Sequence, residues 1–205
     1  MTIKNLHFYS GLIITLFVGL HLFNHSYSIF GVEQHIQMMN RLRLIYRNIF
    51  SETILLLAVG VQIVSGISLF RQKRKTNLDF YGKLQIWSGL YLAFFLLIHV
   101  SAVLGGRYVL GLDTNFYFGV AGLNTFPFSL FFIPYYGLAI LAFFGHIAAI
   151  HATKMKRQIF GISPSKQSNY ILLFGAIFTL IIFYGLTNQF VGVEIPEEFN
   201  ILIGK

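Results

Sequence analysis

The sequence predicts an all-α membrane protein, built as a bundle of five transmembrane helices. Of its 205 residues, 56% are hydrophobic and only 11% are charged, a composition typical of membrane proteins. Five apolar runs each reach the ~20 residues that a helix needs to cross a bilayer core; they cover roughly His7–Ile29, Phe50–Phe70, Leu84–Leu104, Phe128–Ala152 and Tyr170–Phe190. The alternating pattern of barrel strands is absent, so helices are expected. We expect a single domain over residues 1–205.

The basic residues predict how the chain is oriented in the membrane. With the N-terminus inside, ten of the fifteen Lys and Arg fall in inner loops and five in outer loops, and such an excess marks the cytoplasmic side. The net charge of +8 then reflects topology and not a nucleic-acid partner. We expect an integral protein of a bacterial cytoplasmic membrane, with its N-terminus inside and its C-terminus outside. The inner residues are Lys4, Arg71, Lys73, Arg74, Lys75, Lys83, Lys154, Lys156, Arg157 and Lys166, and the outer ones are Arg41, Arg43, Arg47, Arg107 and Lys205.

The first half of the chain is expected to hold two spans and an interfacial helix. The first span runs from about His7 to Ser28 and ends at Gly31; it lacks a small-residue cleavage site, so we expect it to remain in the mature protein. Residues 31–48 are amphipathic and predict a helix on the outer interface. The second span follows from about Ser51, with Glu52 near its outer mouth, and stops at the basic run 71–75.

The second half is expected to hold three spans. The third runs over 82–105, where a Gly-Gly pair predicts its C-terminal stop. A glycine- and aromatic-rich loop over 107–125 follows, and the fourth span covers 128–155 with Pro134 in its early part. Residues 162–165 are predicted to form an inner loop, and the fifth span covers 169–189.

Any redox centre in this chain must be bound by histidine, because a chain with no cysteine cannot form a thiolate metal site or an iron–sulfur cluster. At ~1.5 Å of rise per residue, His21 lies ~21 Å from an inner start at His7, and His99 lies ~25 Å from one at Gly82. Both belong to the outer third of the membrane, whereas His146 and Gln62 belong to the inner half. At 100° per residue, two polar stripes form: Gln85, Ser88, Leu92, Phe95 and His99 on the third span, and Tyr135, Ala139, Ala142, His146 and Thr153 on the fourth.

Two imidazoles at matched depth on different helices suit a low-spin haem b in the bundle core, with one ring on each face of the iron. Two alternatives stay open. Each histidine can instead be a polar core residue hydrogen-bonded to a neighbouring helix, or His21 and His25, one turn apart, can clamp a single transition metal. His7 and His35 lie near the interfaces, and we do not expect them to bind a ligand.

Four segments, in order, resemble a known family. They are Leu6-His7 followed by His21-Leu-Phe-Asn-His25, Leu84-Gln-Ile-Trp-Ser-Gly89 followed by Leu97-Ile-His-Val100, Gly145-His146, and Phe160-Gly-Ile-Ser-Pro164. Together with five spans they resemble the cytochrome b membrane anchor of succinate:quinone and fumarate reductases, of the one-chain, five-helix, two-haem type.

The resemblance implies ligands for two haems. It implies that His21 and His99 hold the outer haem iron and that His146 is one ligand of an inner haem, with Gln85 and Ser88 in the motif before His99. The chain departs from the family at Gln62, where the second ligand of the inner haem is expected, and at Ile86, where the family has an arginine. An amide is a poor axial ligand. We therefore predict one haem b, with a second left open at His146.

The resemblance also implies a function. The chain would anchor flavoprotein and iron–sulfur subunits on its inner face and pass electrons to or from a membrane quinone. A carboxylate at a helix mouth is suited to move the protons of quinone chemistry, so Glu52 is the leading candidate, with Asn40 and Arg43 behind it and an interfacial cap as the other interpretation of Glu52. The alternatives are a stand-alone b-type cytochrome, and a haem-free transport or scaffold bundle whose histidines bind substrate or protons.

Overall fold

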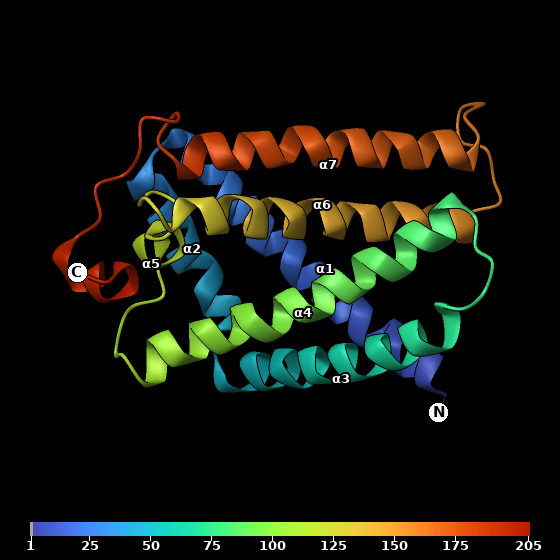
Figure 1. Cartoon of the computed structure of the whole chain (residues 1–205), viewed down its shortest axis with the longest axis horizontal. Helices are drawn as coiled ribbons and strands as arrows, with labels where there is room; N and C mark the ends of the chain where they lie inside the picture. Colours follow the sequence, from blue (N-terminus) through green and yellow to red (C-terminus); the bar gives the residue numbers. More distant parts are fainter. Residues whose placement is uncertain (1) are drawn as a thin grey trace.

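The computed structural model describes residues 2–205, and over this range the secondary structure is helical, with no strand. Figure 1 shows long helices lying side by side, with short helices gathered at one end. The elements are α1 (Ile3–Ser26), η1 (Tyr27–Phe30), α2 (Val32–Tyr46), α3 (Ile49–Lys73), α4 (Phe80–Tyr108), α5 (Phe116–Val120), α6 (Ser129–Lys154), α7 (Pro164–Leu186) and η2 (Glu197–Ile203).

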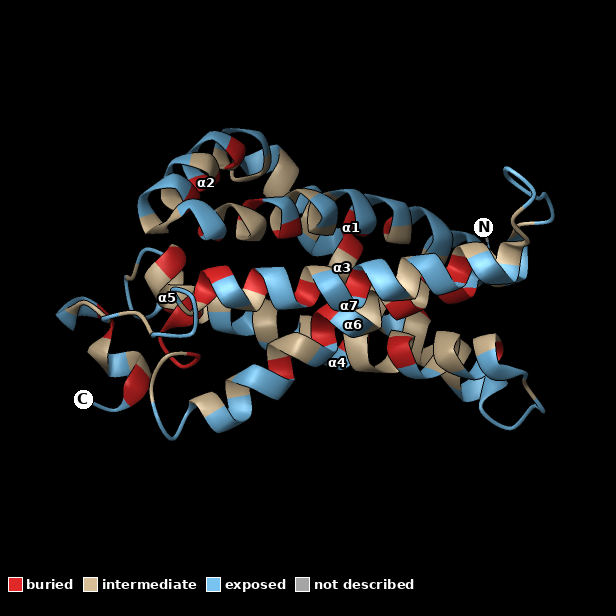
Figure 2. Cartoon of the chain, turned by 90° about the horizontal axis from the view of Figure 1, so that it is seen from above, coloured by how far each residue is buried: buried red, intermediate tan, exposed pale blue. Residues whose placement is uncertain are grey.

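Five of these helices are long and apolar enough to cross a membrane, as the sequence predicts. They are α1 together with η1, α3, α4, α6 and α7, and they are 23 to 29 residues long. Large hydrophobic side chains cover their outer surfaces, and Figure 2 shows exposed residues along the outward sides of the spans. Exposed apolar side chains on this scale are stable in lipid and not in water.

Side-chain caps fix where four of the spans begin. Thr2, Asn48, Asp79 and Ser163 each accept a hydrogen bond from a backbone N–H of the first turn, which satisfies a donor that the helix itself leaves unpaired. The start predicted for the fifth span is wrong by five residues. Ser163 is an N-cap and Pro164 is the first helical residue of α7, because proline lacks only the N–H that a first turn does not use.

The predicted stop of the third span at Gly105 is also wrong. Helix α4 continues through Gly105 and Gly106 to Tyr108, and the chain turns at Gly111, whose φ is +67°. A Cβ on Gly106 would clash with the ring of Phe118 on α5. This glycine therefore provides room for Phe118, and it does not end the helix.

The spans pack as a closed ring in the order α1, α3, α4, α6, α7 and back to α1. Helices α1 and α4 are not neighbours in this ring, so side chains from the two meet only across its interior. The buried hydrophobic core lies at the end that holds α5 and combines residues of α1, α5, α6 and α7. Its buried residues are Leu22, Phe116, Val120, Leu123, Ile140, Ile182 and Leu186.

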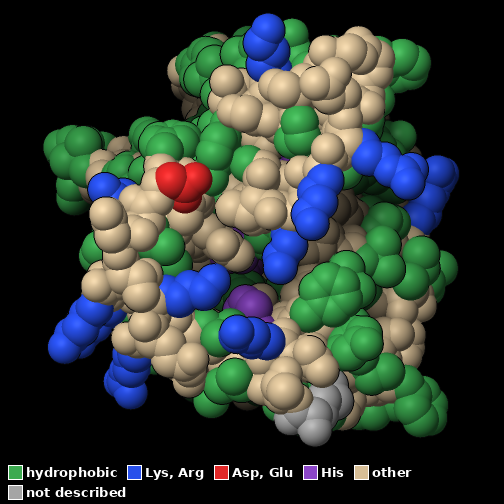
Figure 3. Space-filling model, turned by 90° about the vertical axis from the view of Figure 1, so that its right-hand side faces the viewer, with side chains coloured by type: hydrophobic (Ala, Val, Ile, Leu, Met, Phe, Trp, Pro, Cys, Tyr) green, Lys and Arg blue, Asp and Glu red, His purple; other side chains and the backbone are tan. Residues whose placement is uncertain are grey.

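The two ends of the bundle differ in charge. At the end of the N-terminus, residues 2–6, 71–83 and 152–168 carry ten Lys and Arg but one acidic residue, Asp79. Figure 3 looks onto this end and shows Lys and Arg side chains spread across it. The other end carries α2, α5 and η2, together with the remaining acidic residues. We call the first the basic end and the second the α2 end.

Candidate functional site

The rings of His21 on α1 and His99 on α4 meet across the interior of the helix ring. Their centroids are 6.1 Å apart and their planes are inclined by 67°. Both rings are half-buried, and the ring of His99 has no hydrogen-bond partner among residues 2–205. The structure therefore brings together the two histidines whose depths match in the sequence.

A chain of polar contacts extends from His21 toward helix α2. The Nε2 atoms of His21 and His25 are 3.1 Å apart, and Nδ1 of His25 lies 3.4 Å from Nε2 of His35 on α2. The amide nitrogen of Asn24 donates to the same Nε2 of His35 at 3.2 Å. Oδ1 of Asn24 and Nδ1 of His35 are buried without a hydrogen-bond partner in the described part of the chain.

His35 is the residue of this site that sequence reasoning missed. It was not expected to bind anything because it lies near an interface in the sequence, yet only 2% of its surface is exposed. The signal was its register on α2, since His35, Met39 and Leu42 share one face and are the buried residues of that helix. Burial lowers the pKa of His35 to about 4, with a smaller effect of the nearby charges of His21 and Arg43, so it is neutral at pH 7.

Aromatic rings line both sides of the His21–His99 pair. Phe17, one turn before His21, stacks on its ring at 5.7 Å, and Phe95, one turn before His99, stacks on that ring at 5.0 Å. Tyr136 on α6 meets His99 edge-on at 6.3 Å. These rings give the two imidazoles flat, apolar surroundings.

His146 lies on α6 at a second site, nearer the basic end. Its Nδ1 donates to the backbone carbonyl of Gln85 at 3.0 Å and lies 3.2 Å from Oγ of Ser88. Gln85 therefore contacts His146 through its backbone carbonyl, and Ser88 contacts it through its hydroxyl. With the proton held on Nδ1, Nε2 of His146 carries the free lone pair, which is the orientation that second-shell contacts give to metal-binding histidines.

The side chain of Gln62 forms hydrogen bonds with α1, and in the described structure it forms none with His146. Its amide nitrogen donates to Nε2 of His7 at 3.3 Å, and its Oε1 accepts from the hydroxyl of Ser10 at 2.7 Å. His7 in turn donates from Nδ1 to Ser65 at 2.9 Å. Gln62 stands where the resemblance implies the second ligand of the inner haem, and here it is part of a polar cluster between α1 and α3.

Ion pairs join the loops and helices at the α2 end. Glu52 on α3 pairs with Arg107 on α4, and both side chains are largely buried. Asp113 pairs with Arg43 at 2.9 Å and with Arg47 at 3.4 Å. Burial alone raises the pKa of Asp113, but hydrogen bonds and charges from Arg43 and Arg47 outweigh it and hold this pKa below its ordinary value. Asn40 is exposed on α2 and has no side-chain hydrogen bond to residues 2–205.

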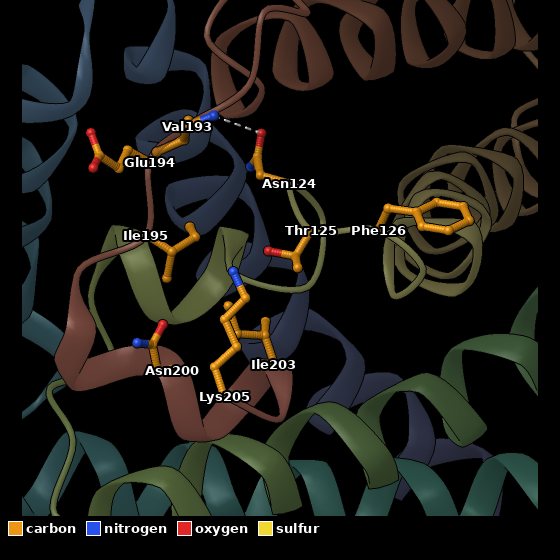
Figure 4. Close-up of a pocket in the computed structure, with 9 residues that line it drawn as sticks. All are labelled: Asn124, Thr125, Phe126, Val193, Glu194, Ile195, Asn200, Ile203 and Lys205. Carbon is orange, nitrogen blue, oxygen red and sulfur yellow. Dashed lines mark hydrogen bonds between the residues drawn. The ribbon is translucent and has the colours of Figure 1, made fainter.

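A hollow of about 560 Å³ lies apart from the histidines, between the loop at 124–126 and the C-terminal segment. Figure 4 shows its lining residues, with Oδ1 of Asn124 accepting from the backbone N–H of Val193 at 3.2 Å. Asn124 also donates to the carbonyl of Leu186. It therefore ties the loop to the end of α7, and none of the site residues expected from the sequence lines this hollow.

Comparison with family models, with curated proteins and with solved structures finds no match to this chain.

Proposed function

We propose that this chain is the cytochrome b membrane anchor of a complex similar to succinate dehydrogenase or fumarate reductase. In this role it binds haem b and carries electrons between an iron–sulfur subunit and a membrane quinone. The observation that carries the proposal is the pairing of His21 with His99 across the ring. An ionisable side chain at membrane depth normally serves a function, and here the ring centroids of two such side chains lie 6.1 Å apart on helices that are not neighbours.

The residues fit a haem held between two imidazoles. Imidazole nitrogens bind transition metals at about 2 Å, so two rings on opposite sides of one iron have their centres roughly 6 Å apart. The observed separation is 6.1 Å. The nitrogens of His99 have no competing hydrogen bond within residues 2–205, and binding through Nε2 of His21 would replace its contact with His25.

A bound haem would supply one-electron chemistry at this position. The chain's own part is to hold and surround it. His21 and His99 provide the ligands, Phe17 and Phe95 stack on these ligands and limit their rotation, and the apolar spans keep water away. Burial and ligand type are the means by which a protein tunes such a centre.

The inner site does not fit a second haem held by two side chains. His146 is oriented as a ligand, but Gln62 is an amide and is already bonded to His7 and Ser10. We therefore derive no step through a second haem, and one haem per chain is the expected content.

Quinone chemistry is assigned to the α2 end, near the single haem. Glu52 and Arg107 place a carboxylate and a guanidinium together at the mouth between α3 and α4. There the guanidinium can donate hydrogen bonds to a quinone oxygen, and the carboxylate can exchange protons with it. Arg43 is held by Asp113, and Asn40 points outward, so both are weaker candidates than Glu52.

The basic end is assigned to the soluble subunits. Its Lys and Arg would attract an acidic partner surface on the inner side of the membrane. With the N-terminus inside, this end would face the cytoplasm, and the flavoprotein and iron–sulfur subunits would dock there.

A reduced-minus-oxidised absorption spectrum of the purified protein tests the proposal. We expect the bands of a bis-imidazole haem b, about one haem per chain by pyridine haemochrome, and flavin and iron–sulfur chains in the same preparation. Absence of haem would overturn the proposal. Haem without partner chains would leave a stand-alone cytochrome.

A haem-free bundle is the second candidate. The observation that favours it is the continuous contact from His21 through His25 to His35 and Asn24, because it gives the imidazoles partners without a metal. The same spectrum distinguishes the two candidates.

A further inference from the structure

Two histidines of helix α1, His21 and His25, hold their Nε2 atoms close together. His21 and His25 are one turn apart, and their Nε2 atoms are 3.1 Å from each other while the ring planes are nearly perpendicular, at 85°. Side chains on a helix lean toward its N-terminus, so the ring of His25 lies over the turn that carries His21. A metal ion binds an imidazole nitrogen at about 2 Å, so an ion bound to one of these nitrogens could be reached by the other after a small side-chain rotation.

The hydrogen bonds fix which nitrogen of His25 is free. The amide nitrogen of Asn24 can only donate, so Nε2 of His35 is an acceptor. Nδ1 of His25 lies 3.4 Å from this same Nε2, so a hydrogen bond between these two nitrogens requires the proton to be on Nδ1 of His25. The lone pair of His25 therefore lies on Nε2, the atom that faces His21, and Nε2 of His21 is the donor between them.

The contacts around the two histidines differ. Metal-binding histidines usually donate from their second ring nitrogen to a fixed acceptor. His25 has such an acceptor in His35, which is buried on α2 and held by Asn24. Nδ1 of His21 has no hydrogen-bond partner among residues 2–205, and His21 is oriented by stacking on Phe17. Before any ligand arrives, His25 is the ring whose tautomer is set for binding.

We infer that His25 would serve as a second, interchangeable ligand of the proposed haem on α1, and that His35 and Asn24 are its positioning residues. The inference rests on the proposed haem and goes beyond it, because it makes α2 part of the ligand-binding machinery. If His21 were removed, Nε2 of His25 would be the imidazole nitrogen of α1 available to hold the haem, while its Nδ1 keeps its contact with His35.

Haem content and the reduced absorption spectrum of purified variants test this. His21→Ala and the more conservative His21→Gln should each keep about one haem per chain, with a shifted α-band. The double variant His21→Ala/His25→Ala should lose nearly all haem, as should His99→Ala. His7→Ala is the matched control, because it removes a half-buried histidine of α1 outside this site and should leave the spectrum unchanged.

A variant of His35, measured in two backgrounds, is the second test of the inference. Second-shell contacts typically change metal affinity by about 10- to 100-fold. His35→Phe should therefore have little effect on haem content in the wild-type background, where His21 binds, and should lower haem affinity by at least about tenfold in the His21→Gln background. A merely structural role of His35 would lower haem retention equally in both backgrounds and would overturn the inference.

The outcomes separate the inference from the proposed function. A wild-type protein without haem overturns both. A haem-containing wild type whose folded, monodisperse His21→Gln variant has none overturns the inference alone. If neither His21 variant folds, His21→Phe takes their place, because it keeps an aromatic ring stacked on Phe17. The inference predicts about one haem per chain for this variant, and a folded His21→Phe protein without haem overturns it.

Discussion

At the scale of single residues, glycines make room for polar side chains within the spans. A Cβ added to Gly11, Gly66 or Gly89 would lie 3.0 to 3.4 Å from the nearest atom of a polar ring or amide on the facing helix. The three pairs are Gly11 with Gln62, Gly66 with His7, and Gly89 with His146. Because helix backbones approach closely where one residue is small, these glycines let each polar side chain reach a partner across the interface.

Gly106 offers a sharper test of such close packing. Gly106→Ala places a methyl group against the ring of Phe118, closer than the two can pack, and overpacking of this kind typically costs about 1–3 kcal/mol. Gly105→Ala is the matched control, since nothing lies within 4 Å of its added Cβ. We expect thermal unfolding in detergent to show a lower midpoint for Gly106→Ala only. Equal midpoints would mean that α5, which carries Phe118, moves away from the added methyl group at no cost in stability.

Asp113 supports a prediction about pH. The lowered pKa of Asp113 means that its pairing with Arg43 and Arg47 contributes stability above the ordinary carboxyl value of 3.8, and that this contribution is lost as pH falls through the lowered pKa. About half of the side chain is exposed, so the contribution is small, at most about 1 kcal/mol. Asp113→Asn should lower the unfolding midpoint at neutral pH, and the difference should vanish in acid. A difference that persists in acid would contradict this.

At the scale of elements, helix α2 packs against α1 at the α2 end of the bundle. Tyr46 at the end of α2 meets Phe17 edge-on at 5.2 Å, and Phe17 stacks on His21. Burial raises the pKa of Tyr46 more than the nearby arginines lower it, so it is a neutral phenol at pH 7. Helix α2 therefore contacts the histidine site twice, through Tyr46 and through His35.

Glu52 joins α3 to α4 at this end, and its replacement tests the quinone assignment. Glu52→Gln removes the charge that pairs with Arg107 and the group that can exchange protons. Because general acid–base groups typically contribute about 10²-fold or more, quinone turnover should fall by at least about tenfold while the haem spectrum stays intact. Asp113→Asn is the control at the same end. An unchanged rate would remove Glu52 from the mechanism.

At the scale of the whole molecule, the distribution of charge predicts orientation. The basic end holds ten Lys and Arg against Asp79 alone, and positive residues in short loops remain on the cytoplasmic side.

The absence of cysteine from the sequence makes this orientation directly measurable. Single cysteines introduced as Lys156→Cys at the basic end and Glu198→Cys at the α2 end should differ in intact cells. A membrane-impermeant maleimide should label only the second, and permeabilisation should expose the first. If the cysteine of Lys156→Cys were labelled in intact cells, the basic end would lie outside and the predicted topology would be reversed.

The sequence by itself determined the five spans and the matched depth of His21 and His99. Hydropathy and a constant rise per residue are local properties, so they locate a residue along its own helix. Only the tertiary structure decided that Gln62 bonds to His7, that Gly106 receives Phe118 and that His35 is buried beside His25. Periodicity gives the face on which a side chain lies, whereas its partner across an interface depends on how helices distant in the chain pack together.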